Sequence, residues 1–298
     1  MSSGYTPPSQ FLNSPGQGVS LLRDSRAARS QHPPSQQTGK LTVAAVSKHY
    51  PLKGKTVCAI RNVSFQVDEG DICVLLGPSG CGKSTLLRMI AGLLPVSSGE
   101  IILSGEPVSG PGRDRGMVFQ SYTSFPWLTV QENVEYGLRV NGYAKKARKE
   151  IASYFIERVK LTKFRDAYPD QLSGGMRQRV AIARTLANGP EILLMDEPFG
   201  SLDAETRWQM QELLLDIVHQ EHVTALIVTH DVDEALFLAD HIVFLSSHPG
   251  TVRDCIAAPL QKGGRPGSKA EMFEIPQYID LEKKIIRLMR EEAYGSSF

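Results

Sequence analysis

A glycine-rich stretch, GPSGCGKS at residues 77–84, has the residue types of a phosphate-binding loop. It follows an apolar run at 72–76 and opens a stretch with helical periodicity, which is the context in which this pattern binds a nucleotide. Its glycines allow backbone N–H groups to surround a β-phosphate at the start of a helix. We expect Lys83 to bridge the β- and γ-phosphates and the Ser84 hydroxyl to bind magnesium. The expected ATP-binding residues of this loop are Gly77, Pro78, Ser79, Gly80, Cys81, Gly82, Lys83, Ser84 and Thr85.

Two acidic residues, Asp196 and Glu197, follow the apolar run at 192–195. Ligands of parallel sheets bind at the carboxyl ends of the strands, so acids at this position can reach a bound nucleotide. We expect Asp196 to hold hydrated magnesium and Glu197 to be the general base for the attacking water. An acid at the end of a buried strand is a weak signal alone, but together with a phosphate-binding loop it becomes a strong indication of a nucleotide site.

A second glycine turn, LSGGMRQR at residues 172–179, lies far along the chain from the phosphate-binding loop. A Ser followed by two glycines at the start of a helix is also a backbone that can close on an anion. One nucleotide site does not need two such turns from distant parts of the chain. Two further polar stretches complete the pattern, DEPFGSLD at 196–203 and IVTHD at 227–231.

In this order after a phosphate-binding loop, these stretches resemble the ATP-binding subunits of ABC transporters, and the resemblance covers residues 41–250. LSGGMRQR is similar to the signature motif of that family, with Met176 where Gln is commonest. Gln120 is similarly identified as the Q-loop glutamine and His230 as the switch histidine. The resemblance implies that Gln120 binds magnesium, that His230 contacts the γ-phosphate and that Tyr50 stacks on adenine. A simple surface tyrosine is the alternative interpretation of Tyr50.

The resemblance also explains the second glycine turn, because two subunits of that family pack head to tail. Ser173, Gly174 and Gly175 of one subunit then close over ATP held by the other, so that ATP joins the subunits. Asp203, in a stretch similar to the D-loop, is expected at the same interface, although Asp is also a favoured helix cap. The implied partner is a second ATPase subunit, either a copy of this chain or a paralogue. The expected catalytic residues are Glu197, His230 and Gln120, and the expected magnesium ligands are Ser84, Gln120 and Asp196.

The composition of the 298-residue chain, 41% hydrophobic and 22% charged, is that of an ordinary globular protein. A net charge of +1 argues against a dedicated nucleic-acid binder, which would usually be strongly basic. No apolar run approaches the roughly 20 residues that cross a bilayer, so any membrane role is expected to be peripheral. The four cysteines show no CxxC spacing, which disfavours a metal site and suits a reducing cytoplasm.

The order of the elements predicts an α/β fold of the P-loop NTPase class, with a parallel, RecA-like sheet core and an antiparallel β region. We expect an ATPase domain over residues 41–250, with an α-helical subdomain inserted at about 121–187. Residues 251–298 are expected to form an extension, with a linker at 261–270 and a helix that begins near Pro276 and docks on the main body. The apolar face of that helix consists of Leu281, Ile285, Leu288 and Met289.

Two stretches, at 121–138 and 241–252, resemble the importer branch of the family that serves nitrate, sulfonate, taurine and bicarbonate. The resemblance implies two membrane-spanning permease subunits, indirectly a solute-binding protein, and a peripheral location on the cytoplasmic face of the plasma membrane. The first stretch carries Tyr122, Phe125 and Trp127, and we expect these aromatic residues to hold a helix of a permease subunit. A soluble ABC-type ATPase outside transport and an export ATPase are the alternatives. The transported solute is not encoded in such a subunit.

Residues 1–40 are rich in Pro, Ser, Gln and Gly and lack a continuous apolar core. Such a segment cannot bury enough apolar surface to offset its ordering entropy, so we expect a disordered tail. Its four basic residues and one acidic residue also permit a weak attraction to anionic lipid, but a solvated tail is the simpler interpretation.

A chain that starts at Lys40 is therefore expected to fold and to hydrolyse ATP with little change in rate. Limited proteolysis of the full chain should cleave the tail first, because exposed polar termini are preferred cleavage sites. Mass spectrometry of the early fragments and an ATPase assay of the shortened chain measure both effects. A protected tail, or activity lost on trimming, would show that the tail docks on the ATPase.

Overall fold

The computed structural model describes residues 39–52, 54–121, 123–258, 271–272 and 274–295, and the largest layer among them is a six-stranded sheet. Its strand order is β10-β9-β3-β8-β7-β6, parallel from β9 to β6, with β10 antiparallel to β9. The strands are β3 (Ile72–Leu76), β6 (Arg115–Val118), β7 (Ile192–Asp196), β8 (Thr224–Thr229), β9 (His241–Leu245) and β10 (Val252–Ala257). The predicted tail 1–40, apart from its last two residues, lies outside the described residues, as do the linker 261–270 and Tyr122.

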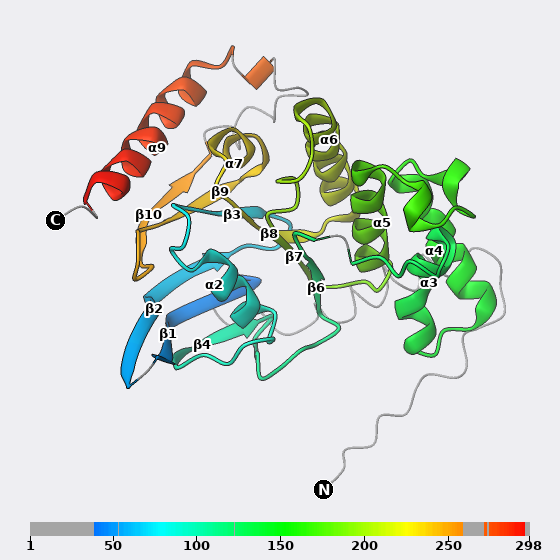
Figure 1. Ribbon diagram of the computed structural model, residues 1–298, viewed down its shortest axis with the longest axis horizontal. Coiled ribbons are helices and arrows are strands. Elements are labelled where there is room, and N and C mark those ends of the chain that lie inside the picture. The colour runs from blue at the N-terminus through cyan, green and yellow to red at the C-terminus, as the bar shows by residue number, and fades with distance from the viewer. Residues whose placement is uncertain (1–38, 53, 122, 259–270, 273, 296–298) are drawn as a thin grey trace, which may run out of the picture.

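A second, antiparallel sheet has the order β2-β1-β4-β5. Its strands are β1 (Leu41–Leu52), β2 (Lys55–Val67), β4 (Ser98–Leu103) and β5 (Glu106–Pro107). Figure 1 shows this sheet beside the six-stranded sheet, with α2 (Lys83–Ile90) between them. Accordingly, α2 contacts β2 as well as β7 and β8.

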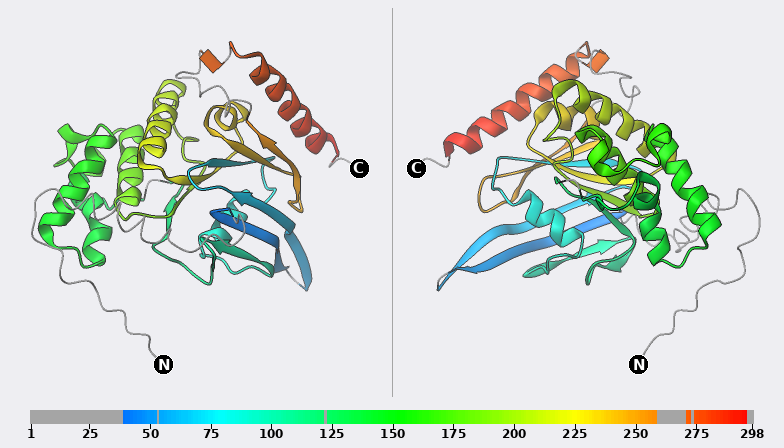
Figure 2. Two further views of the ribbon diagram at one scale, coloured as in Figure 1. Left: turned by 180° about the vertical axis from the view of Figure 1, so that it is seen from behind. Right: turned by 45° about the vertical axis from the view of Figure 1, so that its right-hand side comes forward.

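Three helices lie between β6 and β7 in the chain, as the predicted helical insertion requires. They are α3 (Val130–Val140), α4 (Lys145–Arg158) and α5 (Gly174–Leu186), with short 3-10 turns at Thr162–Phe164 and Pro169–Gln171. Both views in Figure 2 show α3 and α4 at one end of the molecule, away from the two sheets. The predicted fold class is confirmed, because a parallel sheet core, an antiparallel β region and inserted helices are all present.

Alternate residues of the central strands point to opposite faces of the six-stranded sheet, and both faces are covered. Ile72, Val74 and Leu76 belong to a core cluster shared with α5, α6 (Ala204–Glu221) and α7 (Val232–Leu238). Cys73 and Leu75 belong to a second cluster, shared with α2 and the antiparallel sheet. A strand buried on both faces is expected to be continuously apolar, which is why these short runs could be recognised in the sequence.

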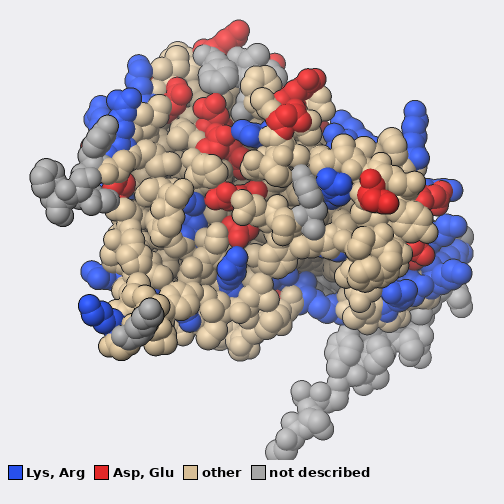
Figure 3. Space-filling model, in the orientation of Figure 1, with Lys and Arg blue, Asp and Glu red and all other residues tan. Residues whose placement is uncertain are grey.

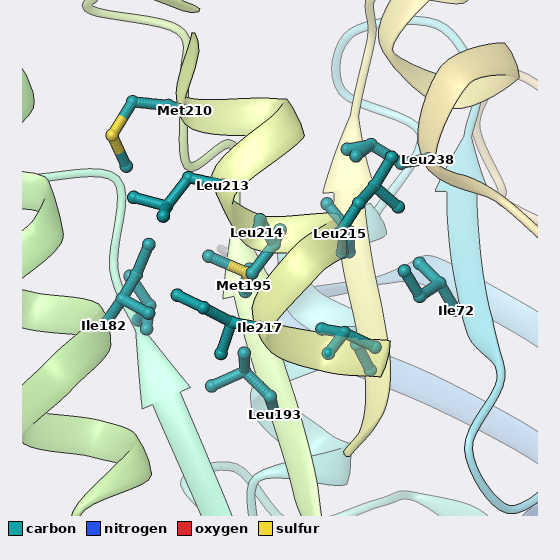
Figure 4. Close-up of a cluster of buried hydrophobic side chains, with 14 of the residues drawn as sticks. Ile72, Ile182, Leu193, Met195, Met210, Leu213, Leu214, Leu215, Ile217 and Leu238 are labelled. Carbon is teal, nitrogen blue, oxygen red and sulfur yellow. The ribbon is translucent and has the colours of Figure 1, made fainter. Parts of the chain in front are cut away.

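Helix α6 closes the first of these clusters. Figure 4 shows Leu214 and Ile217 of α6 beside Met195 and Leu193 of β7, with Met210 farther along the helix. The α6 residues recur at helical spacing, which places them on one face of the helix.

The last helix, α9 (Pro276–Gly295), begins where the sequence predicts and docks on the main body. Leu281 and Ile285 are buried in the first core cluster, with Leu288 and Met289 partly buried against it. α9 contacts α7, and Figure 1 shows it running beside β10. β10 itself was not predicted; it extends the six-stranded sheet beyond residue 250, where the ATPase domain was expected to end.

The surface carries charges of both signs. In Figure 3, Lys and Arg gather near α9 and over the inserted helices, with Asp and Glu between them. Within the described part of the chain, no helix has the length and apolar character needed to cross a membrane.

Candidate active site

The phosphate-binding loop connects β3 to α2, and its glycines adopt conformations that other residues rarely adopt. Gly80 and Gly82 have φ values of +78° and +97°. Gly82 is also the N-cap of α2, and a Cβ there would lie 2.5 Å from Ile60 Cδ1. Glycine at these positions therefore allows the loop to turn tightly into the N-terminus of α2, which is favourable for an anion.

Lys83 is 5% exposed and folds over the loop that precedes it. Its Nζ donates hydrogen bonds to the carbonyl oxygens of Gly77 (2.7 Å) and Pro78 (2.9 Å). Its third donor faces Cys81 Sγ at 3.9 Å, a weak acceptor that a phosphate oxygen can replace. Burial raises the pKa of the Cys81 thiol, although Lys83 opposes the shift. Cys81 therefore contributes its backbone to the loop and does not present a reactive thiol.

Ser84 and Asp196 meet at the carboxyl end of the parallel strands. The Ser84 hydroxyl donates a 2.8 Å hydrogen bond to Asp196 Oδ1, and Asp196 is buried. The pair brings a hydroxyl and a carboxylate together beside the phosphate-binding loop. Hard oxygen ligands of this kind suit magnesium, so the residues present fit the ion that the sequence motif implies.

Glu197, Gln120 and His230 form a second group at the same edge of the sheet. Gln120 Nε2 donates to Glu197 Oε2 at 3.3 Å, and His230 Nδ1 lies 3.3 Å from Glu197 Oε1. Glu197 has a φ of +45°, an uncommon conformation for a residue with a side chain, and its backbone N–H donates to Val228 O at 2.9 Å. Strained backbone of this kind is characteristic of functional sites.

The signature turn and the D-loop lie side by side, each at the start of a helix. Ser173 is the N-cap of α5 and accepts a hydrogen bond from Met176 N at 3.3 Å. Asp203 caps α6 in the same way, and the hydrogen bond from the backbone N–H of Thr206 lowers the pKa of its carboxyl. A Cβ on Gly175 would lie 2.6 Å from Thr206 Cγ2, so glycine allows the two turns to approach.

The structure does not bring the signature turn to the phosphate-binding loop of the same chain. α5, which is capped by Ser173, contacts α3, α4, α6 and β6, whereas α2 contacts β2, β7 and β8. The two helices bury their apolar side chains in different core clusters, on opposite faces of the six-stranded sheet. Figure 1 and both views of Figure 2 show the two helices apart.

Tyr50 lies on β1 within the β1–β2 hairpin, where the residue is 37% exposed. Lys48 Nζ lies 5.3 Å from the centre of the ring. This position is compatible both with an adenine-stacking residue and with a surface tyrosine.

Two features of the site region were missed by sequence reasoning. Arg207 donates to Leu202 O at 2.9 Å and pairs with Asp231 at 3.4 Å, so it links the D-loop to the residue after the switch histidine. The segment 246–251 packs behind the phosphate-binding loop. Arg207 could not be identified from the sequence, because an arginine early in a helix is usually solvated. The segment 246–251 lies within a stretch that resembles the importer branch, but the sequence assigned no structural role to it.

Comparison with known proteins agrees with this arrangement. Residues 60–200 match the family described as ABC transporter. The chain is 45% identical to the nitrate import ATP-binding protein of Synechocystis sp., over 84% of this chain and 95% of that protein. It is 43% identical to the aliphatic sulfonates import ATP-binding protein of Bacillus cereus, over 83% of this chain and 94% of that protein.

Solved structures give the same result. The chain is similar to a dimeric ATP-binding cassette in a post-hydrolysis state with bound ADP and phosphate, with a TM-score of 0.65 and 32% identity. The match covers 73% of this chain and 98% of that one. The resemblance inferred from the motifs is therefore confirmed. The chain belongs to the ABC transporter family, as one of its ATP-binding, ATP-hydrolysing subunits.

Proposed function

We propose that this subunit dimerises on ATP, with a copy of itself or a paralogue, and powers the import of a small anion through two membrane-spanning permease subunits. Nitrate, sulfonate, taurine and bicarbonate are the candidate anions, delivered by a solute-binding protein. Two of the related proteins are named for nitrate and sulfonate import, which supports this choice. The subunit would then act at the cytoplasmic face of the plasma membrane, as a peripheral protein. Residues 41–250 would be its ATPase domain, 121–187 the inserted helical subdomain and 251–298 an extension.

The main observation in favour of a dimer is that the signature turn is separated from the phosphate-binding loop of the same chain. The exposed Ser173 begins a helix on the opposite face of the sheet from α2, so its N-terminal dipole is not directed at its own chain's nucleotide. The N-terminus of a helix preceded by a Ser-Gly-Gly turn is suited to an anion. In a head-to-tail dimer, Ser173, Gly174, Gly175 and Asp203 of one subunit face the ATP of the other, and the dimeric cassette is a precedent for two chains in contact.

Within one subunit, the phosphate-binding loop holds the phosphates and Lys83 neutralises part of their charge. Ser84, Asp196 and Gln120 are the residues that would hold magnesium, which when bound offsets the charge on the phosphate oxygens. Tyr50 would stack on the adenine ring.

Glu197 accepts a proton from the attacking water, because its carboxylate lies at the strand edge beside the phosphate-binding loop. Gln120 and His230 contact its two carboxylate oxygens and so fix its orientation. Glu197, His230 and Gln120 thus form the catalytic group, with His230 also able to contact the γ-phosphate.

The groove beside Gln120 is the proposed contact with a permease. It has a volume of about 480 Å³, and its lining includes Phe119, Phe125, Tyr136 and Arg184. The rings of Phe125 and Tyr136 lie 4.4 Å apart, and the Arg184 guanidinium lies 5.3 Å from the Phe125 ring. An apolar, aromatic groove of this kind suits the apolar face of a partner helix.

The segment that forms one wall of this groove is firmly held. Asn133 is fully buried and accepts a hydrogen bond from Phe125 N at 2.8 Å. Its amide donates to the carbonyl oxygens of Phe125, Leu128 and Thr129 at 2.9–3.1 Å. A preformed groove reduces the ordering cost of binding a helix.

Replacing Glu197 with Gln should retain ATP binding and slow hydrolysis by roughly 100-fold or more, because the general base is lost. The ATP-bound dimer should also live longer. Steady-state phosphate release and size-exclusion chromatography with ATP measure the two effects. Glu106→Gln, which neutralises an exposed acid on β5, is the control and should hydrolyse ATP normally. Near-normal ATP hydrolysis by Glu197→Gln would show that Glu197 is not the general base.

Replacing Trp127 with Ala should weaken assembly with the permease subunits by about tenfold, since exposed tryptophans often dominate interface energies. Trp127 is 70% exposed and its ring lies 5.7 Å from that of Phe125, so its removal should spare the isolated subunit. Phe125→Asp should also uncouple transport, but Phe125 packs within the subunit and its loss can affect folding. Co-purification and ATPase activity of the free subunit measure the effects. Ile279→Ala, which shortens an exposed side chain of α9, is the control. Equal assembly of both variants would contradict a permease contact at this aromatic segment.

Mixed dimers test the shared site. Lys83→Ala disables the phosphate-binding loop and Ser173→Arg blocks the signature turn, so dimers of either variant alone have two broken sites and should trap no nucleotide. In a mixed dimer, the intact Lys83 of one chain faces the intact Ser173 of the other. One complete site is rebuilt, and up to one occluded nucleotide per mixed dimer should be recovered by filter binding. If Ser173 instead contacted the ATP of its own chain, mixed dimers would trap no nucleotide, even when their formation is demonstrated.

A further inference from the structure

The segment 246–251, which joins β9 to β10, lies directly behind the phosphate-binding loop. A Cβ on Gly250 would overlap the carbonyl group of Cys81, and a Cβ on Gly77 would lie 2.6 Å from Leu245 O. Glycines at these points let the two stretches of backbone touch without side chains between them. A displacement of the segment would therefore act directly on the phosphate-binding loop.

One side of this segment is attached to the antiparallel sheet. Gly250 N donates to Ala59 O at 3.0 Å, and Arg61 N donates to Gly250 O at 2.9 Å. The segment is also closed on itself, because the hydroxyls of Ser246 and Thr251 lie 2.8 Å apart and Thr251 N donates to Ser246 Oγ at 3.0 Å. It is thus a compact turn closed by its own hydrogen bonds.

The other attachment comes from the end of α9. Glu292 is buried and accepts a 2.6 Å hydrogen bond from the backbone N–H of Ser247. Arg253 on β10 pairs with both Glu292 and Glu291. Burial acts to raise the pKa of the Glu292 carboxyl, but the hydrogen bonds from Ser247 and Arg253 outweigh it and the pKa lies below its ordinary value. The carboxylate is therefore charged and held in place at neutral pH.

We propose that Glu292 is a positioning residue for the phosphate-binding loop. By holding Ser247, it keeps the segment 246–251 against the backbone at Cys81, and so fixes the N–H groups that surround the phosphates. Anion binding by backbone N–H groups depends on their being arranged beforehand, because each group that must be ordered on binding reduces affinity. The C-terminal helix thereby contributes to nucleotide affinity from a place where it touches no nucleotide.

The test compares two variants of the full chain that each break one polar contact of α9. Glu292→Ala removes the acceptor of Ser247, whereas Lys284→Ala removes the 2.7 Å ion pair with Asp254 on β10 and leaves segment 246–251 untouched. The dissociation constant of ADP is measured by isothermal titration calorimetry. It should rise about fivefold to tenfold in Glu292→Ala, less than the loss of a whole hydrogen bond to a charged group, because only part of that free energy reaches the nucleotide through the loop. It should change less than about twofold in Lys284→Ala.

Steady-state kinetics separate positioning from general stability. In Glu292→Ala the KM for ATP should rise in parallel with the ADP dissociation constant while kcat changes less than about twofold, because the catalytic group is not altered. Unchanged ADP affinity in Glu292→Ala, or an equal loss in both variants, would overturn the proposal. If Glu292→Ala does not fold, Glu292→Gln decides, because a neutral amide oxygen accepts the hydrogen bond from Ser247 more weakly than a carboxylate does and is no longer held by an ion pair with Arg253. Its ADP dissociation constant should rise about twofold or more, and an unchanged value would overturn the proposal.

Discussion

Parallel pairing of β3, β8 and β7 is the interaction on which the active site depends. Leu76 pairs with Thr229 and Asp196 with Val228, so the three strands end at the same level of the sheet. The residues that follow each strand are therefore brought to one edge, although they are far apart in the chain. A shift of register by one residue would turn every side chain of a strand to the other face, and two separate apolar cores oppose such a shift.

The polar groups gathered at this edge are held by one another. Lys83 contacts the carbonyl oxygens of its own loop, Ser84 contacts Asp196, and Glu197 lies between Gln120 and His230. Buried or half-buried polar groups need such partners, because leaving them without hydrogen bonds is costly. A phosphate oxygen or a metal ion could replace one partner in each of these contacts. A bound ligand could therefore take over these interactions without leaving a charged group unpaired.

The fold class and most of the candidate site were predictable because they depend on local residue types. Positive φ at Gly80 and Gly82 and complete burial of β3 leave a direct mark on the sequence. β10 could not be recognised in the sequence, because it contains polar, partly exposed residues and becomes a strand only by pairing with β9. The hydrogen bonds of Arg184 to Thr123 were equally unpredictable, because they join residues far apart in the chain. The pairing of the signature turn with a second subunit stays a prediction from the resemblance.

α5 connects the turn at Ser173 to the aromatic groove. It begins at the signature turn, and its Arg184 binds Thr123 O and Oγ1 at 2.7 and 2.6 Å beside the aromatic groove. At 1.5 Å per residue, the eleven residues from Ser173 to Arg184 span about 16 Å of stiff helix. A tilt of about 10° around the Ser173 end would carry Arg184 through about 3 Å, which follows from this length. The stiffness of α5 therefore means that a small rotation at the turn would be converted into a displacement of atomic size at the groove.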